Sequence, residues 1–134
     1  MADTQFDVLT IGNAIVDVIA PITRDFLERE NMAEGIMHLV DADRSAYLYD
    51  RMPPDKRQIS GGSSANTAAG VASYGGRAAF VGKVAADDLG GIFADDLREI
   101  GVHYSIGRLH EGPATARSMI LVSPGGERTM NTYL

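Results

Sequence analysis

Two adjacent glycines, Gly61 and Gly62, followed by small residues from 63 to 74, restrict the folding of this chain more than any other stretch. Glycine adopts positive φ and has no Cβ, so the pair predicts a tight turn that a ligand can approach closely. One of the two serines after the pair is a candidate cap for the helix that follows, whose first turn presents unpaired backbone N–H groups. Asn66 falls in that turn, and the tilt of helical Cα–Cβ bonds leans its amide over the glycines. The stretch predicts either a cradle for a neutral, hydroxyl-bearing ligand or a plain tight loop before a capped helix.

A second polar pair, Asn13 and Asp17, follows the first apolar run, residues 6–11, which Gly12 closes. If residues 13–19 are extended, strand alternation turns positions 13, 15 and 17 to one face, at the carboxyl end of a core strand. Open α/β sheets bind ligands at that end. An ionised carboxylate only accepts hydrogen bonds, and it can take two hydroxyl donors from a vicinal diol. The alternative is a surface aspartate on an edge strand.

Hydrophobic periodicity predicts alternating strands and helices, which is typical of a layered α/β core. We expect a close backbone neighbour at Gly70 within the glycine-led helix, because glycine weakens a helix interior. Asp87 and Asp88 are expected to cap the helix after them, and a type II turn centred on Pro124 and Gly125 is expected to join a hairpin. Core strands are expected at 6–11 and 78–84, helices at about 24–31, 41–48, 63–74 and 89–100, hairpin strands at 115–122 and 127–133, a loop or edge strand at 55–59, and three extra strands, in a small separate sheet, at approximately 15–22, 36–40 and 102–108.

Composition excludes several classes of function. The net charge of −6 over 134 residues argues against nucleic acid or an anionic membrane as a general partner. No window is apolar for the length of a membrane span, and the N-terminus lacks the pattern of a signal peptide. The chain has no cysteine, which excludes disulfides and thiol catalysis and predicts a cytoplasmic location. The three histidines lack metal-ligand spacing, so no metal site is expected.

Familiar phosphate-binding patterns are missing from the chain, including the Gly-x4-Gly-Lys-Ser/Thr loop and Gly-x-Gly-x-x-Gly. Lys83 and Arg128 each lie near the end of a predicted strand. Either cation is a candidate contact for a phosphate group, or a solvated charge at the end of its strand.

Several motifs occur together in an order that resembles the ribokinase-type (PfkB) carbohydrate kinase family, and within it the adenosine kinase branch. The resemblance spans essentially the whole chain. It rests on Gly12-Asn13-x3-Asp17, on Gly61-Gly62-x3-Asn66-x-Ala68 with Tyr74-Gly75-Gly76, on Val81-Gly82-Lys83-Val84 with Asp87-Asp88-x-Gly90, and on Gly126-Glu127-Arg128-Thr129-Met130.

The resemblance implies an enzyme that transfers the γ-phosphoryl group of ATP, with Mg²⁺, to a hydroxyl of a nucleoside or sugar. It implies a ribokinase-like, Rossmann-like layered α/β core with a small β-sheet lid, for which the three extra strands are the candidates, and a possible homodimer through those strands. Arg128 matches a position that approaches the transferred phosphate. The sugar hydroxyls would be held by Asn13, Asp17, Gly61, Gly62 and Asn66.

Two departures from the family pattern shape the prediction. Ribose-specific members carry a lysine within the glycine motif where this chain has Ser63 and Ser64, which favours a nucleoside or another sugar over ribose. The family's catalytic aspartate lies in a Gly-x-Gly-Asp run that this sequence lacks. We therefore expect residues 1–134 to be the N-terminal part of a kinase domain, with the catalytic aspartate beyond residue 134 and the ATP-binding C-terminal half absent. The alternative is a non-catalytic sugar- or nucleoside-binding or dimerisation module.

Overall fold

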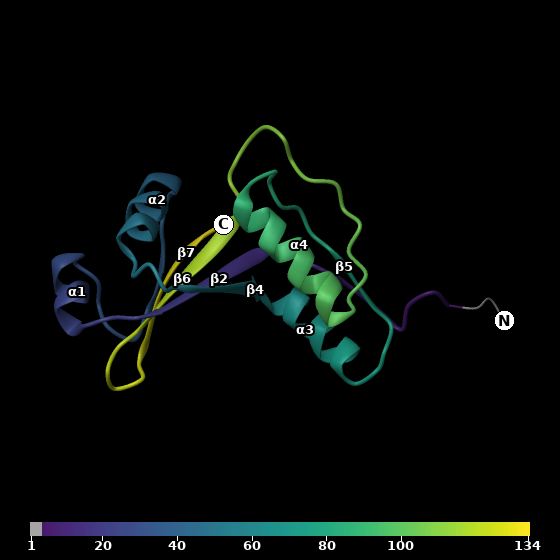
Figure 1. Ribbon diagram of the computed structural model, residues 1–134, viewed down its shortest axis with the longest axis horizontal. Helices are drawn as coiled ribbons and strands as arrows, with labels where there is room; N and C mark the ends of the chain where they lie inside the picture. The colour runs from purple at the N-terminus through teal and green to yellow at the C-terminus, as the bar shows by residue number, and fades with distance from the viewer. Residues whose placement is uncertain (1–3) are drawn as a thin grey trace. The chain divides into compact units, whose positions relative to one another are not determined.

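The computed structural model describes residues 4–134, which form two compact units (Figure 1). The first unit contains the chain up to Val16 together with Ile59–Ala116. The second contains Asp17–Gln58 and Arg117–Leu134. The chain therefore passes from one unit to the other three times.

The first unit combines a two-stranded parallel sheet with two helices. Strand β1 (Val8–Ile11) pairs with β5 (Ala78–Val81), as expected for a parallel pair separated by a helix. Helix α3 (Ser63–Ser73) packs on both strands, and α4 (Asp88–Ile100) lies beside α3 (Figure 1). The first three residues of β5 are buried, which is typical of a strand in a parallel sheet. The predicted order of strand, helix, strand and helix is confirmed in this unit.

Three aromatic rings form the centre of this unit. Phe80 of β5 lies with its ring centroid 5.5 Å from Phe93 of α4 and 5.8 Å from Tyr104, and the last two rings are 5.6 Å apart, edge to face. The Tyr104 hydroxyl donates to the Gly82 carbonyl at 2.9 Å. Burial raises the pKa of this phenol, because the charged form is disfavoured away from water. The cluster therefore joins β5, α4 and the segment that follows α4.

That segment, residues 102–108, is not the strand of a separate sheet that the sequence predicts. Within it, one isolated bridge forms, which joins His103 to Ala79 of β5. The prediction is wrong because Val102 and Tyr104 bury their side chains in the core of the first unit. The segment therefore runs along β5 as a connection.

Gly70 lies inside α3, and its expected close neighbour is also absent. Among the described residues, no atom outside its own helix and chain neighbours lies within 4 Å of the position that a Cβ at Gly70 would occupy. Helix packing therefore does not explain glycine at this position.

A five-stranded sheet, in the order β3-β7-β6-β2-β4, organises the second unit. Strand β3 is parallel to β7, and β7 is antiparallel to β6. Strands form here near 15–22 and 36–40, as expected. The hairpin joins this same sheet. The segment near 55–59, expected as a loop or edge strand, contributes to one edge of the sheet. The strands are β2 (Ile15–Pro21), β3 (Met37–Leu39), β4 (Arg57–Gly61), β6 (Ala116–Val122) and β7 (Arg128–Tyr133), so β2, β4 and β6 extend across the boundaries of the unit.

The turn between β6 and β7 differs from the expected type II turn. The Gly126 amide donates to the Ser123 carbonyl at 2.8 Å, so the turn contains Pro124 and Gly125 as expected. The positive φ, however, falls on Gly126, at 90°, and not on Gly125. A type II turn needs positive φ at its third residue, so this turn is of another type, with the left-handed residue just where the chain returns to β7.

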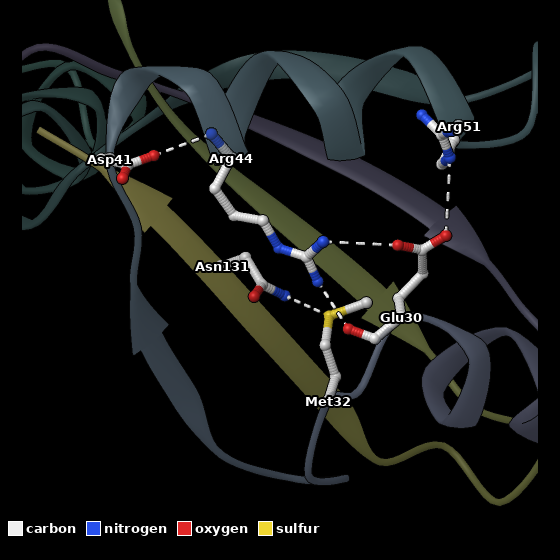
Figure 2. A network of polar contacts seen from close by, with 6 residues as sticks. All are labelled: Glu30, Met32, Asp41, Arg44, Arg51 and Asn131. Atoms are coloured by element: carbon white, nitrogen blue, oxygen red, sulfur yellow. Dashed lines mark hydrogen bonds and ion pairs between the residues drawn. The ribbon is translucent and has the colours of Figure 1, made fainter.

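Two helices, α1 (Arg24–Arg29) and α2 (Ala42–Arg51), complete the second unit, and α2 contacts β7. Asp41 caps α2 and accepts a hydrogen bond from the Arg44 backbone amide at 2.8 Å. Figure 2 shows how Glu30, just after α1, joins the two helices. Its carboxylate lies 3.4 Å from Arg44 and 3.7 Å from Arg51, and its carbonyl accepts from Arg44 at 2.5 Å. The side chain of Glu30 is 10% exposed, so solvent screens these pairs less than it screens surface pairs.

Candidate functional site

The turn at Gly62 lies directly against the backbone of Asn13. Gly62 has φ 92° and ψ 142°, close to a region that only glycine populates readily. A Cβ built on Gly62 would lie 2.8 Å from the Asn13 carbonyl oxygen, which is closer than carbon and oxygen approach without a bond. The backbone N–H of Asn66 donates to the Gly62 carbonyl at 2.9 Å. Two motifs that are almost fifty residues apart in the sequence are therefore in contact within the first unit.

The serines after the glycine pair do not cap α3, contrary to the sequence-based expectation. The N-cap is Gly62, with no side-chain hydrogen bond. The Ser64 hydroxyl instead donates to the Ile11 carbonyl at the end of β1, at 2.9 Å. A Cβ at Gly12 would collide with this serine side chain. The prediction is wrong because the positive φ of Gly62 turns the chain into the helix one residue earlier, which leaves Ser64 to tie α3 to β1.

The two asparagine amides remain available to a ligand. Asn13 and Asn66 are exposed, and within residues 4–134 neither side chain has a hydrogen-bond partner. Gly61, by contrast, is buried. Each free amide offers both donors and an acceptor, as recognition of hydroxyl groups requires.

Asp17 lies on β2, at the point where the chain enters the second unit. Alternation along the strand places Asp17 on the same face as Ile15 and Ile19, opposite the buried Val16 and Val18. The strand begins at Ile15, so this alternation does not extend to Asn13. The carboxylate is half-buried and has no hydrogen bond or ion pair with the described residues. Burial raises the pKa of Asp17, because the charged carboxylate loses hydration without gaining a partner.

The two candidate phosphate contacts are both exposed. Arg128 is the first residue of β7 in the second unit, and Lys83 follows β5 in the first. Neither side chain has an ion-pair partner among the residues that the structure describes.

Sequence reasoning missed two hydrogen-bonded anchors that α4 provides. The Asp96 carboxylate accepts from the Ser60 amide at 2.7 Å, one residue before the glycine pair. Asp87, which caps α4 as expected by accepting from the Gly90 amide at 2.8 Å, also accepts from the Thr115 amide at 2.9 Å and from its hydroxyl at 2.6 Å. Thr115 is buried and lies just before the chain leaves the first unit.

A sequence signal for Asp96 exists. The apolar stripe of α4 includes Leu89, Ile92 and Phe93, and Asp96 follows them at helical spacing, before Ile100. An acid within the apolar stripe of an amphipathic helix needs a partner. The partner is a backbone amide, which no sequence pattern names.

Comparison with known proteins identifies the family. A family model described as pfkB family carbohydrate kinase matches residues 29–134. The chain belongs to the pfkB family. An adenosine kinase structure from Sinorhizobium meliloti is similar over 98% of this chain, with 57% identity and a TM-score of 0.85. A structure described as a probable sugar kinase from Rhizobium etli is similar over 98%, with 54% identity and a TM-score of 0.86. A probable fructokinase-3 from Arabidopsis thaliana is 42% identical over 73 residues, or 54% of this chain.

These similarities confirm the predicted family and its ribokinase-like α/β fold class. The chain spans 40% of each of the two solved chains and 21% of the Arabidopsis protein.

The described residues do not fit the ATP and Mg²⁺ that the family implies. Residues 4–134 contain no group of three histidine, aspartate or glutamate side chains that could hold a metal ion. The sequence has no phosphate-binding loop of the common types. Within the same residues, no helix combines the length and apolar content that crossing a bilayer demands.

Proposed function

We propose that this chain supplies the substrate-binding part of a pfkB kinase that phosphorylates a hydroxyl group of a nucleoside or sugar. The observation that carries the proposal is the Gly62 turn, packed on the Asn13 backbone in a conformation that excludes any side chain. The Asn13 carbonyl occupies the space that a Gly62 side chain would need, so the turn holds the Asn13 backbone next to the start of α3. The side-chain amides of Asn13 and Asn66, which have no partner among the described residues, flank this turn in the sequence. A turn that only glycine adopts readily occurs often where a backbone approaches a ligand closely.

In this proposal, the Asp17 carboxylate accepts hydrogen bonds from two hydroxyl groups of the substrate. Its carboxylate is half-buried without a protein partner, so hydrogen bonds from a diol would restore what burial removes. Asn13 and Asn66 contact further hydroxyls, while Gly61 and Gly62 form the floor of the cradle. Arg128 is the proposed contact for the transferred phosphate.

A ribose-bearing nucleoside is the proposed substrate. The relative described as an adenosine kinase is 57% identical over nearly the whole chain, whereas the fructokinase matches 54% of it. The glycine motif of this chain also lacks the lysine that the ribose-specific members carry. Fructose and related sugars are the alternative substrates.

In this proposal, the chemistry of transfer belongs to the residues of a pfkB kinase that this chain does not span. ATP would supply the phosphoryl group and Mg²⁺ would neutralise its charge, both held mainly by those residues, with an aspartate there as the catalytic base. The strands proposed as a lid, β2 and β3, would exclude water during transfer.

We also propose a homodimer through the edge strand β3. Met37 and Leu39 are exposed there, at 51% and 68%, on a strand that pairs with β7 and with no other strand of residues 4–134. An exposed apolar edge strand favours pairing with another chain.

The test uses the protein produced from the intact gene, with adenosine, ribose and fructose as acceptors in the presence of ATP and Mg²⁺. We expect phosphorylation of adenosine. In calorimetric titration, Asp17→Ala should weaken nucleoside binding by about 100-fold or more, because two hydrogen bonds to a charged group are lost. The control is Asp25→Ala, an exposed acid on α1. A product with no kinase activity on any acceptor would refute the function, and normal binding by Asp17→Ala would refute the assigned site.

Stability gives a second measurement on Asp17. Its folded-state pKa lies above 3.8, so its contribution to stability is greatest below that pH and is lost as the pH rises through the raised value. Asp17→Asn removes the desolvated charge and should raise the melting temperature at pH 7 more than at pH 3. Equal effects at both pH values would contradict the cause assigned to the shift.

A further inference from the structure

Gly61 and Gly62 have no side-chain contacts that could stabilise the conformation of their backbone. Glycine loses more backbone freedom on folding than any other residue, and neither Gly61 nor Gly62 has a side chain to pack. After the turn, the Gly62 carbonyl accepts a hydrogen bond from the backbone N–H of Asn66 at 2.9 Å. Before the turn, the Ser60 amide is fixed by a carboxylate oxygen of Asp96 at 2.7 Å. The turn is therefore held from both sides, and α4 provides the contact that precedes it, through Asp96.

The position of β4 explains why Ser60 needs a side-chain partner. Strand β4 is the last strand of its sheet, so the amides on its outer side have no neighbouring strand in the described chain. The Ser60 amide is one of these, since its acceptor is Asp96 on a helix of the first unit. A partly buried amide without an acceptor is costly, and a charged acceptor forms a stronger hydrogen bond than a neutral one.

The chain crosses between the two units a second time before Ser60 and a third time after Thr115, and at each of these two places an aspartate of α4, or its N-cap, binds a backbone amide. Ser60 is the second residue after the chain enters the first unit, and Thr115 is the last but one before it leaves. Asp96 fixes the former and Asp87 the latter. The neighbouring acid, Asp95, has no such role: its side chain is 78% exposed and pairs with Arg98 on the same helix, at 3.6 Å.

We propose that Asp96 is a positioning residue for the substrate cradle, which it sets by fixing the Ser60 backbone immediately before Gly61 and Gly62. This inference rests on the proposed function for its consequence in catalysis, but not for the contact itself. Asp96 touches neither substrate nor the reacting atoms, and acts through the path of the backbone. Loss of the carboxylate releases the first side of the turn, so the glycines sample conformations that do not bind the acceptor substrate.

The first measurement is amide hydrogen exchange at Ser60 in the intact gene product, which needs no substrate. We expect Asp96→Ala to accelerate exchange at Ser60 by about tenfold or more, as for the loss of one hydrogen bond to a charged group. Asp96→Asn retains an acceptor oxygen and should restore much of the protection. Asp95→Ala is the matched control and should exchange as the wild type does.

The second measurement separates positioning from general stability. Asp96→Ala should raise the KM for adenosine by about tenfold, with the KM for ATP unchanged, and Asp96→Asn should recover most of the loss. If the alanine variant fails to fold, Asp96→Glu, which keeps the charge but displaces it by one methylene, should show the same selective rise.

The outcomes are distinguishable. Unchanged Ser60 exchange in Asp96→Ala overturns the inference whatever the enzyme's activity. Accelerated exchange with an acceptor KM equal to that of Asp95→Ala overturns the positioning role. A wild-type protein that phosphorylates no acceptor refutes the proposed function, and the exchange experiment still decides whether Asp96 holds the turn.

Discussion

Replacing Gly62 with alanine should destabilise the protein substantially, and the structure separates two causes. The first is the backbone, since φ 92° with ψ 142° costs a residue with a side chain about 1–3 kcal/mol. The second is the new methyl group, which would lie 2.8 Å from the Asn13 carbonyl oxygen. That oxygen belongs to the backbone and cannot rotate away, so we assign a further cost of about 1–3 kcal/mol, as for overpacking in a core.

The sum, about 2–6 kcal/mol, is a large fraction of the 5–15 kcal/mol that typically separates folded from unfolded protein. Gly70→Ala provides the matched control. It makes the same chemical change inside α3, where φ is not positive and a new Cβ has open space. Alanine there should stabilise the protein by about 0.5–1 kcal/mol through helix propensity.

Urea unfolding, followed by far-ultraviolet circular dichroism, measures both changes. With slopes of about 1–3 kcal/mol per molar urea, Gly62→Ala should lower the midpoint by about 1 M or more, and Gly70→Ala should raise it slightly. Equal midpoints for the two variants would refute the reasoning, since the two sites would then not differ in backbone conformation or in available space. If Gly62→Ala unfolds at the wild-type urea concentration but no longer binds the nucleoside, the substitution affects binding alone. That result would contradict the predicted clash with the Asn13 carbonyl.

Two further predictions concern charge and association. Hydrogen bonds from the side chain and the backbone amide of Arg77 lower the pKa of Asp7 from 3.8 to about 2, so the stability that this pair contributes is present above pH 3.8 and is lost as the pH falls toward 2. Arg77→Gln removes the guanidinium but keeps the backbone amide that donates to Asp7 at 2.8 Å, so the pKa of Asp7 measured by NMR should rise toward 3.8. An unchanged pKa would exclude the guanidinium as its main cause. Leu39→Lys should convert the proposed dimer to a monomer in sedimentation velocity experiments while Tyr74→Lys, an exposed residue of the first unit, should not, and a monomeric wild type would contradict the dimer.

Local features were predictable where local chemistry decides them. The caps formed by Asp41 and Asp87 follow from an acidic residue just before an amphipathic run, because a carboxylate satisfies the free amides of a first turn. Gly101 ends α4 in the left-handed conformation, as glycine after an apolar stripe predicts. The order of motifs predicted the family and its α/β fold, which the comparisons confirm.

Contacts between distant segments were not predictable in this way. Residues 102–108 resemble a strand by composition, but the burial of Val102 and Tyr104 assigns them to the first unit. Ser64 is a good cap by type, yet the carbonyl of Ile11 takes its hydroxyl. Propensity describes what a segment can form alone, and these outcomes depend on which partner the rest of the chain brings to it.

The sequence by itself determined that the chain contains a helix that begins at a glycine pair and a strand that carries an acid, since the freedom of glycine and the acceptor character of a carboxylate are properties of the residues. Only the tertiary structure decided that Gly62 rests on the Asn13 backbone and that Asp96, rather than Asp95, holds Ser60. The physical reason is that both contacts join positions far apart in the chain, and one of them uses a backbone amide that every residue except proline possesses.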